Sequence, residues 1–431
     1  MITKTNLKRV LIVGAGFGGL RAATALRSEP IEVLLIDRNN YHLFQPLLYQ
    51  VATAGLEPEQ VARPVRGILR GQENFRFLTA EVEAIDFPAR RVITDRGDLT
   101  YDYLILAPGA ESNSFGLPGI AECALHLKDL DDAVQIRNHI LRCFERATWE
   151  SQNDLPQAWL TFLVVGGGPT GVEMAGSLAE LVQYLRSGEF HSMGLPRARI
   201  ILAEMAQRLL PEMQTSSSKA ALESLSGKGV EVWLGRAVRA YDGFKVEFDH
   251  GEYLEARTLI WAAGVSAAGL LQRLDVPHGP LGRVAVLPTL QLEAHPEVYV
   301  IGDGAYIPAQ REEALPMMAP VATQMAERAT ANIRRDLRGQ SQAPFRYKDP
   351  GRLATIGRNA AVAEIGRLRF RGFLAWVVWL VVHLIQLVGF RNRLMVLISW
   401  AWEYLTYERA VRLIQGRLPA VSEAEVPGEC S

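Results

Sequence analysis

A chain of 431 residues is too long to fold around a single hydrophobic core, so two or three domains are expected. Hydrophobic residues make up 48% of the chain and charged residues 22%, which is typical of a globular α/β protein and excludes disordered and fibrous classes. The net charge of -1 gives no general attraction to nucleic acid, and we expect no nucleic-acid partner.

Seven apolar runs predict β-strands, and helical patterns separate most of them. The runs cover residues 9–13, 32–36, 103–107, 159–165, 199–203, 258–262 and 298–301. This alternation indicates parallel sheets covered by helices. Because two of the runs lead into glycine-rich turns, the same βαβ module is expected twice. The predicted fold class is α/β, with two Rossmann-like domains.

The first glycine turn has the pattern G-x-G-x-x-G directly after the run 9–13 and before a helical stretch. Gly14 allows the tight turn, Gly16 lets the backbone approach a pyrophosphate, and Gly19 allows close packing of helix and strand. The helix N-terminus supplies N–H groups and the positive end of a dipole. Asp37 ends the next strand and is placed to accept hydrogen bonds from a ribose. Together these features predict a dinucleotide site.

Two later segments favour FAD as the dinucleotide at this turn. Residues 100–109 predict a strand that closes on small residues, where the chain can pass close to a nucleotide. Residues 301–303 end another strand with the carboxylate of Asp303, which suits the ribityl hydroxyls of a flavin. Both segments resemble the ATG-like and GD motifs of the two-dinucleotide-binding flavoprotein superfamily.

The second glycine turn, at Gly166, Gly168 and Gly171, again follows a strand and precedes a helix, and it is expected to hold a nicotinamide cofactor. Glu204 ends the next strand, although a polar insert makes its separation from the turn longer than usual. A carboxylate there would repel a 2'-phosphate, so NADH is favoured over NADPH. Arg208, a nearby cation, is the residue that would favour NADPH instead.

Glu173 is predicted to lie in the first turn of the helix that follows the second glycine turn. Two interpretations remain open. The acid could simply be stabilised by the helix dipole, or it could orient the nicotinamide amide beside the flavin ring. In similar flavoproteins the matching glutamate has the second role.

The second module lies in the middle of the chain, whereas the run at 298–301 needs a sheet to join. We therefore expect an NADH domain inserted into an FAD domain. The predicted FAD domain comprises residues 1–112 and 288–345, and the NADH domain comprises residues 113–287. The composition changes near residue 346, so residues 346–431 are expected to form a third, helical unit that associates with a membrane.

The cysteines argue against two branches of the superfamily. Disulfide reductases carry C-x4-C after the first acidic strand, but residues 41–50 contain no cysteine. Sulfide:quinone reductases need paired cysteines near the flavin, whereas Cys123, Cys143 and Cys430 lie far apart in the sequence. No His/Cys cluster suggests a metal site. Direct transfer from reduced flavin to a diffusible acceptor remains.

The C-terminal region suggests where that acceptor is found. Residues 373–390 are almost wholly apolar but slightly short for a membrane span. Residues 394–414 mix tryptophan and tyrosine with glutamate and arginine, which suits a bilayer interface. We favour helices that lie on the membrane, and a true span or a buried dimer or core helix remain open. Arginines flank the apolar run on both sides: Arg367, Arg369, Arg371, Arg391 and Arg393.

Over almost its whole length the chain resembles the type II NADH dehydrogenases, which are single-subunit, FAD-containing NADH:quinone oxidoreductases. The resemblance is carried by residues 40–55, 167–173, 260–265, 301–303 and 315–324, and in the tail by 356–358, 375–376 and 389–393. It implies hydride transfer from NADH to FAD N5, and then transfer of two electrons to a membrane quinone. No bundle of spans with intramembrane acids is visible in the sequence, so proton pumping is not expected.

The family often has A-Q-x-x-x-Q at the junction of flavin and quinone, whereas this chain has Pro320 in place of the first glutamine. Gln324 matches the second glutamine and is expected to contact a quinone carbonyl, unless it is an ordinary helix residue. Ala319 is expected to offer its N–H to the flavin pyrimidine. The tail helix around residues 383–387 is expected to close the quinone pocket.

The candidate site residues form three sets. The candidate catalytic residues are Glu173 and Gln324. The candidate FAD contacts are Gly14, Ala15, Gly16, Phe17, Gly18, Gly19, Asp37, Arg38, Gln45, Val82, Ala107, Pro108, Gly109, Asp303 and Ala319. The candidate NADH contacts are Gly166, Gly168, Pro169, Thr170, Gly171, Glu173, Glu204, Ala263 and Gly264.

The expected partners are NADH, a membrane quinone, the lipid bilayer surface and, from the family alone, a second copy of the chain. The expected location is the cytoplasmic face of the cell membrane, as a peripheral or monotopic protein. Alternatives are an enzyme that prefers NADPH, a flavoprotein reductase with a soluble acceptor, and a redox-sensing interaction protein. Assays with and without the tail would separate them.

Overall fold

The computed structural model describes residues 7–150, 157–308, 314–406, 409 and 411–415. It contains two compact units, each built from segments that are far apart in the sequence. The first unit comprises Met1–Leu43, Ala62–Glu111 and Val265–Asp349. The second comprises Phe44–Val61, Ser112–Gly264 and Pro350–Ser431.

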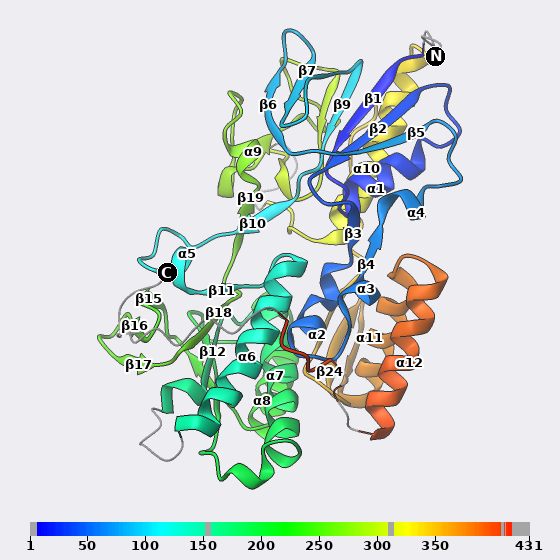
Figure 1. Cartoon of the computed structure of the whole chain (residues 1–431). Helices are drawn as coiled ribbons and strands as arrows, with labels where there is room; N and C mark the ends of the chain where they lie inside the picture. The colour runs from blue at the N-terminus through cyan, green and yellow to red at the C-terminus, as the bar shows by residue number, and fades with distance from the viewer. Residues whose placement is uncertain (1–6, 151–156, 309–313, 407–408, 410, 416–431) are drawn as a thin grey trace. The chain divides into compact units, whose positions relative to one another are not determined.

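The first unit contains a five-stranded parallel sheet (Figure 1). Its strands, in spatial order, are β21 (Val298–Val300), β9 (Tyr103–Leu106), β1 (Arg9–Val13), β2 (Glu32–Asp37) and β5 (Phe75–Thr79). Val10, Leu11 and Ile12 of the central strand have no exposed surface. Such continuous apolar strands are typical of a sheet that is covered on both faces.

Two helices of the first unit pack against each other, α1 (Phe17–Ala25) and α10 (Ala319–Leu337). The unit also contains an antiparallel sheet of β6 (Val82–Asp86), β7 (Arg91–Thr94) and β8 (Leu99–Thr100). A short antiparallel pair, β3 (Tyr41–Leu43) and β4 (Ala62–Pro64), lies where the chain leaves the unit and returns to it.

The second unit repeats the parallel arrangement. Its five strands, in spatial order, are β11 (Leu125–His126), β18 (Thr258–Trp261), β12 (Thr161–Val165), β13 (Arg199–Glu204) and β14 (Val230–Leu234). Helix α7 (Pro169–Ser187) follows the central strand and buries one long face. Helices α6 (Leu130–Glu150) and α8 (Thr215–Gly227) and the antiparallel strands β15 (Val238–Tyr241), β16 (Lys245–Phe248) and β17 (Tyr253–Glu255) complete this part.

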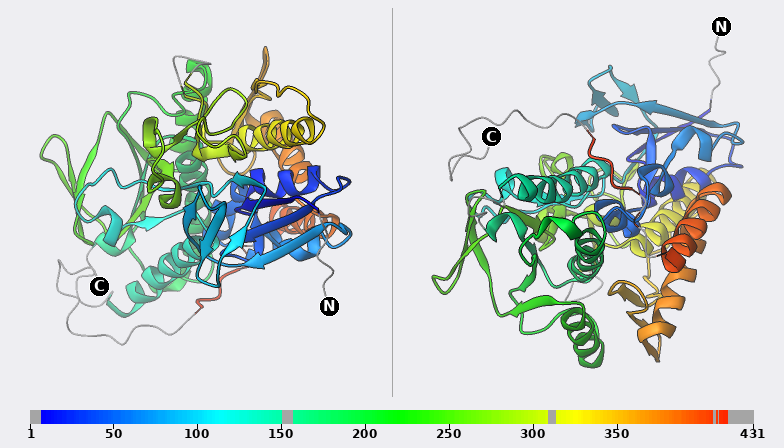
Figure 2. Two further views of the ribbon diagram at one scale, coloured as in Figure 1. Left: turned by 90° about the horizontal axis from the view of Figure 1, so that it is seen from above. Right: turned by 60° about the horizontal axis from the view of Figure 1, so that its bottom comes forward.

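The C-terminal region belongs to the same second unit. An antiparallel sheet of β23 (Arg352–Thr355), β24 (Ala361–Ile365) and β25 (Leu368–Arg371) leads into α11 (Gly372–Gln386) and α12 (Phe390–Thr406). The two helices lie side by side (Figure 2). Among the helices that the structure describes, none combines the length and the hydropathy that crossing a bilayer requires.

The predicted α/β fold with two Rossmann-like sheets is confirmed. Along the sequence, the strands of the second sheet lie between segments of the first unit. All seven predicted strands are present within about two residues. Residues 44–61, with the short helices α2 (Leu48–Ala52) and α3 (Pro58–Val61), lie in the second unit. There α2 packs on α6 and α7, and α3 packs on α12.

Candidate functional site

The first glycine turn is tightly folded at Gly14 and Gly19 and open at Gly16. Gly14 has a φ of +97°, and its N–H donates to the Ile36 carbonyl at 2.8 Å. A Cβ on Gly14 would lie 2.2 Å from the Ala107 oxygen, and one on Gly19 would lie 1.8 Å from the Gly14 oxygen. Both positions therefore require glycine. A Cβ on Gly16 would meet no atom within 4 Å, so the backbone there is open to a ligand.

The second glycine turn has the same geometry. Gly166 has a φ of +113°, and its N–H donates to the Ala203 carbonyl at 2.8 Å. A Cβ on Gly166 would lie 2.5 Å from the Ala262 oxygen, and one on Gly171 would lie 1.8 Å from the Gly166 oxygen. Gly168 is again open, because a Cβ added there would meet no atom within 4 Å.

Each turn binds the acid that ends the neighbouring strand. Asp37 accepts hydrogen bonds from the backbone N–H groups of Ala15 at 2.6 Å and Asn39 at 2.7 Å. Glu204 accepts from the N–H of Gly167 and from the N–H of Ala206, the latter at 2.6 Å. The carboxylates are thus fixed at the carboxyl ends of β2 and β13, where a nucleotide ribose would lie.

Burial raises the pKa of Asp37, and the N–H groups of Ala15 and Asn39 oppose that shift. A carboxylate in this position can still accept from ribose hydroxyls, because each oxygen has more than one lone pair.

A buried acceptor beside the first turn supports the fit of a cofactor. His42 is 2% exposed, and its Nδ1 bonds the Ala15 carbonyl at 2.9 Å. That bond makes Nδ1 the donor, so Nε2 is an acceptor. Among the described residues no donor reaches Nε2. Phe17 stands edge-on to the imidazole, with the ring centroids 5.1 Å apart. Such an unpaired acceptor next to the open turn is suited to a hydroxyl-bearing cofactor.

The remaining candidate FAD contacts of the first unit surround the same edge of the sheet. Asp303 lies in a 3-10 turn (Gly302–Gly304) after β21, and Gly302 has a φ of +71°. Ala319 is the first residue of α10, whose N-terminus has no side-chain cap. Ala107, Pro108 and Gly109 follow β9; Gly18 lies in α1; Val82 begins β6 and is buried; and Arg38 is exposed.

Gln45 is the one candidate FAD contact that the structure places in the second unit. Its side chain is exposed, and Nε2 donates to the Lys128 carbonyl at 3.1 Å. Within the described residues, no cluster of acidic, cysteine or histidine side chains is arranged to bind a metal ion.

The candidate NADH contacts of the second unit also converge on one sheet edge. Pro169 and Thr170 are the first two residues of α7, and their accessible positions leave the helix N-terminus open to a pyrophosphate. Ala263 and Gly264 follow β18, which is the neighbour of β12 on the side opposite to β13.

Glu173 lies one turn inside α7 and not in its first turn, because the helix begins at Pro169. The residue is 9% exposed, and its carboxyl accepts from the backbone N–H of Thr355 at 3.2 Å. Burial raises the pKa of Glu173 to about 8, although the Thr355 N–H and the nearby Trp379 indole lower it. The carboxyl is therefore mostly protonated at pH 7. An acid stabilised by the helix dipole would show the opposite shift.

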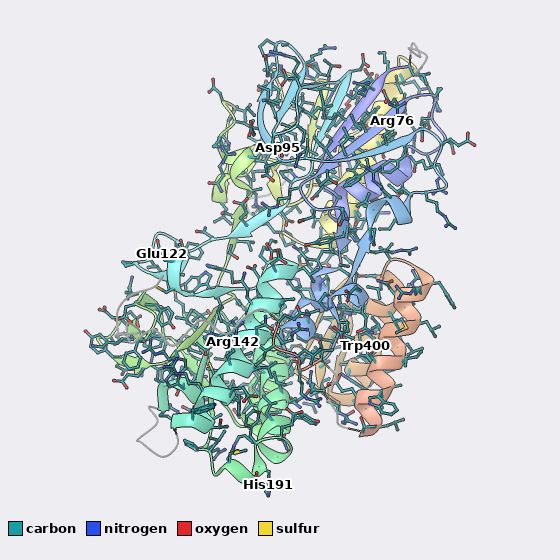
Figure 3. The ribbon with its side chains drawn as sticks, in the orientation of Figure 1. Arg76, Asp95, Glu122, Arg142, His191 and Trp400 are labelled. Atoms are coloured by element: carbon teal, nitrogen blue, oxygen red, sulfur yellow. The ribbon has the colours of Figure 1, made fainter. Side chains whose placement is uncertain are left out.

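Aromatic residues of the tail pack beside Glu173. Trp379 of α11 is 1% exposed and stacks on His383, with the ring centroids 4.1 Å apart. The rings of Tyr49 and Trp400 lie 6.5 and 5.7 Å from the Trp379 ring. Trp400 comes from α12 (Figure 3). Burial lowers the pKa of His383 to about 4, so its imidazole is neutral.

Gln50 links two of these aromatic residues. Its Nε2 donates to the Tyr49 hydroxyl at 2.8 Å, and its Oε1 accepts from Trp400 Nε1 at 2.8 Å.

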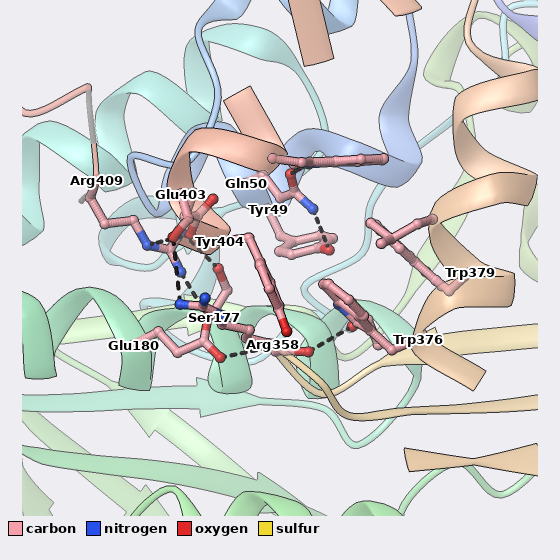
Figure 4. A pocket seen from close by; sticks show the side chains of 14 residues that line it. Tyr49, Gln50, Ser177, Glu180, Arg358, Trp376, Trp379, Glu403, Tyr404 and Arg409 are labelled. Atoms are coloured by element: carbon pink, nitrogen blue, oxygen red, sulfur yellow. Dashed lines mark hydrogen bonds and ion pairs between the residues drawn. The ribbon is translucent and has the colours of Figure 1, made fainter. Parts of the chain in front are cut away.

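An ion cluster around Arg409 lies next to the aromatic residues (Figure 4). The Arg409 side chain is 5% exposed and pairs with Glu180 at 2.9 Å and with Glu403 at 3.0 Å. It also donates to the Thr53 carbonyl at 3.3 Å and reaches the Ser177 hydroxyl at 3.5 Å. A pocket of about 60 Å³ is lined both by this cluster and by the tryptophans Trp376, Trp379 and Trp400.

The side chain of Gln324 is engaged by the backbone of a later segment. Its Nε2 donates to the Lys348 carbonyl at 2.8 Å, and its Oε1 accepts from the Lys348 N–H at 3.0 Å. One N–H and one lone pair of the amide remain for a further partner.

Several residues of these sites were not predicted as site residues from the sequence: His42, Tyr49, Thr355, Trp379 and Arg409. One available signal was the spacing of Ala375, Trp379 and His383, which repeats every four residues and marks the buried face of α11. Residues 407, 408 and 410 of the predicted interfacial stretch 394–414, and also Cys430, fall outside the described residues.

Comparison with known proteins shows the family to which the chain is similar. Residues 8–326 match the family model described as pyridine nucleotide-disulphide oxidoreductase, and residues 350–407 match the NDH2 C-terminal domain. The chain is 40% identical over 416 residues to a protein of Mycobacterium tuberculosis named type II NADH:quinone oxidoreductase Ndh, and the match covers 93% of this chain and 89% of that protein. A Staphylococcus haemolyticus protein named type II NADH:quinone oxidoreductase is 31% identical, over 83% of this chain and 90% of its own.

Solved structures share the fold. The structure of NDH2 from Plasmodium falciparum in complex with NADH matches with a TM-score of 0.83 and 21% identity, over 93% of this chain and 98% of that one. The sulfide:quinone oxidoreductase of Aquifex aeolicus matches with a TM-score of 0.67 and 19% identity, over 95% of this chain and 93% of that one.

Proposed function

Because the chain belongs to the family of type II NADH:quinone oxidoreductases, we propose that it oxidises NADH and passes two electrons through FAD to a membrane quinone, without pumping protons. The observation that carries this proposal is the repeated turn. Both glycine turns have the same hydrogen bond, the same two obligatory glycines and the same open position. Each also fixes an acid through backbone N–H groups.

FAD supplies the redox chemistry when it is bound: it accepts a hydride from NADH and gives two electrons to the quinone. The chain supplies binding and orientation. In the first unit, the Gly16 backbone would lie against the pyrophosphate, and Asp37 would accept from the ribose. The Ala319 N–H, at the uncapped start of α10, would donate to the pyrimidine of the flavin.

In the second unit, Gly168 and the N-terminus of α7 would hold the pyrophosphate of NADH, and Glu204 would accept from its adenosine ribose. The Arg208 guanidinium makes hydrogen bonds within the protein: it donates to the Pro211 carbonyl and to the Thr215 hydroxyl. This arrangement supports NADH over NADPH, because the Arg208 guanidinium is already engaged and is not offered to a 2'-phosphate.

Glu173 would orient the carboxamide of the nicotinamide. A protonated carboxyl can donate a hydrogen bond through its O–H and accept one at its other oxygen, so it complements an amide in both directions. Burial keeps it protonated near neutral pH. Gln324 would contact a quinone carbonyl with its remaining N–H.

We also propose the domain roles that the sequence predicted: FAD binding by residues 1–112 and 288–345, NADH binding by 113–287, and membrane attachment by 346–431. The exposed surface of the tail helices supports the last role. On α12, Phe390, Leu394, Leu397, Ile398 and Leu405 are between 44% and 80% exposed and lie along one face. On α11, Leu374, Val381 and Ile385 form a similar exposed stripe.

Such a wide apolar surface is unusual for a protein face in water and is typical of an interface. Two exposed arginines of the β24–β25 hairpin, Arg367 in its turn and Arg369 in β25, would face phosphate groups of the lipid. We propose that the protein attaches peripherally to the cytoplasmic face of the cell membrane, as a homodimer, as the family resemblance implies.

Steady-state turnover of the FAD-loaded protein with NADH and NADPH, against ubiquinone and menaquinone analogues, tests the proposed function. We expect quinone-dependent oxidation with a clear preference for NADH. Faster turnover with NADPH would contradict the role of Glu204. Turnover with a soluble acceptor but with no quinone would favour the alternative reductase.

A further inference from the structure

The loop at residues 113–116 is fastened to the chain that follows β18. The Asn113 N–H donates to the Gly264 carbonyl at 3.1 Å. The Trp261 indole N–H donates to the Asn113 carbonyl at 2.8 Å. Asn113 also accepts the N–H of Phe115 on its side-chain oxygen, at 2.8 Å. Three hydrogen bonds therefore fix the position of Phe115 relative to residues 261–264.

Phe115 has an unfavourable backbone conformation and an unusually exposed side chain. Its φ is +53°, in the left-handed region that costs a residue with a Cβ about 1 kcal/mol. Its side chain is 54% exposed, although it is a large apolar group. The tip of its ring lies over Gly264, where a Cβ would come within 2.7 Å of the ring Cζ. The ring stands edge-on to Trp261, with the centroids 6.5 Å apart.

The order of the strands indicates what lies next to this ring. Glu204 ends β13, on one side of the central strand β12, and marks the adenosine half of the dinucleotide. On the other side of β12 lies β18. A dinucleotide whose pyrophosphate lies at Gly168 must therefore extend its nicotinamide half toward residues 262–264. Gly166 packs directly against Ala262, so the two loops form one continuous surface.

We propose that the exposed ring of Phe115 packs on the nicotinamide riboside half of NADH and positions it in the second unit. This inference rests on the proposed NADH site and adds a residue to it. An aromatic face offers dispersion and stacking contact to a flat heterocycle and its ribose. The left-handed backbone and the exposed phenyl group are then explained together, because strained residues persist where a ligand uses them. Gly264 is required because a side chain there would displace the ring.

The test compares the two halves of the substrate, using the full-length FAD-loaded enzyme. The variants are Phe115→Leu, which keeps an apolar side chain over Gly264, Phe115→Tyr, which keeps the ring, and Glu204→Ala as the matched control at the adenosine end. The measured quantities are kcat, KM for NADH, KM for reduced nicotinamide mononucleotide, and the inhibition constant of ADP-ribose, which lacks the nicotinamide.

For Phe115→Leu we expect KM to rise about five-fold for both NADH and the mononucleotide, as loss of aromatic stacking predicts. The inhibition constant of ADP-ribose should not change, and Phe115→Tyr should resemble the wild type. Glu204→Ala should raise the inhibition constant of ADP-ribose and leave the KM for the mononucleotide unchanged. The inference would be overturned if Phe115→Leu left KM for NADH and the mononucleotide unchanged. It would also be overturned if the variant raised the inhibition constant of ADP-ribose by the same factor as these KM values. A wild-type enzyme that does not oxidise NADH would instead overturn the proposed function itself.

Discussion

The Glu173 carboxyl accepts a hydrogen bond from the backbone N–H of Thr355 at 3.2 Å, and this bond joins helix α7 to the first strand of the C-terminal sheet. The candidate catalytic acid is therefore packed against the C-terminal region within one unit. Its burial there, and not a neighbouring charge, is the main cause of its raised pKa.

The first prediction concerns the pH dependence of stability. Burial raises the pKa of Glu173 from 4.5 to about 8, so between these values the folded protein keeps a proton that the unfolded chain releases. The contribution of Glu173 to stability therefore falls as pH rises through this window and is constant above it. Glu173→Gln removes the titration. Measured by denaturant unfolding, the variant should gain stability relative to the wild type between pH 5 and about 8. A difference that does not depend on pH would show that Glu173 titrates normally.

The second prediction separates two roles of Gln324. If its free N–H contacts the quinone, Gln324→Ala should raise KM for quinone while leaving reduction of the flavin by NADH unchanged. Lys348→Pro removes the backbone N–H that Gln324 accepts, and it serves as the control for the anchoring role. Equal changes in both variants would mean that Gln324 only fixes the Lys348 segment.

The third prediction concerns the ion cluster at Arg409. Arg409→Met would leave Glu180 and Glu403 without this buried cation, and breaking a buried pair typically costs about 3 kcal/mol. Burial already raises the pKa of Glu403, and Arg409 opposes that rise. The loss of unfolding free energy in Arg409→Met should therefore be smaller at low pH, where Glu403 is protonated. Adding Glu403→Gln should restore part of the stability. Unfolding free energies that match the wild type at pH 8 would contradict the structural role of Arg409.

The fourth prediction concerns the exposed face of α12. Replacing Leu394 and Ile398 by aspartate places charge on the apolar stripe without touching the buried Asn392 and Val396. Sedimentation with lipid vesicles should show reduced binding, whereas turnover with a water-soluble quinone analogue should persist. A matched pair of aspartates at the exposed Leu281 and Leu287, which belong to the other unit, should have no effect on binding. Unchanged vesicle binding of the α12 variant would argue against this surface.

The dinucleotide turns could be predicted from the sequence because all their determinants are local. The strand, the glycines and the start of the helix occupy about ten consecutive residues, and steric rules alone make Gly14 and Gly166 obligatory. The acids Asp37 and Glu204 were found for the same reason, since each ends the next strand of its module.

The surroundings of Glu173 could not be predicted in this way. The bond to Thr355 joins residues 182 positions apart, and no local pattern indicates which strand packs on α7. The expectation that Glu173 lies in the first turn was wrong because the helix begins at Pro169, which moves the acid one turn inward. The partner of Gln324 was missed because Lys348 contributes only its backbone, so its side chain carries no signal.

In the proposed reaction, NADH and FAD act in sequence on one chain. Anaerobic stopped-flow spectroscopy of the purified, FAD-loaded protein tests this order of transfer. NADH should bleach the visible absorbance of the flavin, because two-electron reduction converts the bound flavin to its reduced form, and a quinone analogue added afterwards should restore that absorbance. Flavin that NADH reduces but quinone does not reoxidise, or flavin that NADH leaves oxidised, would contradict the account.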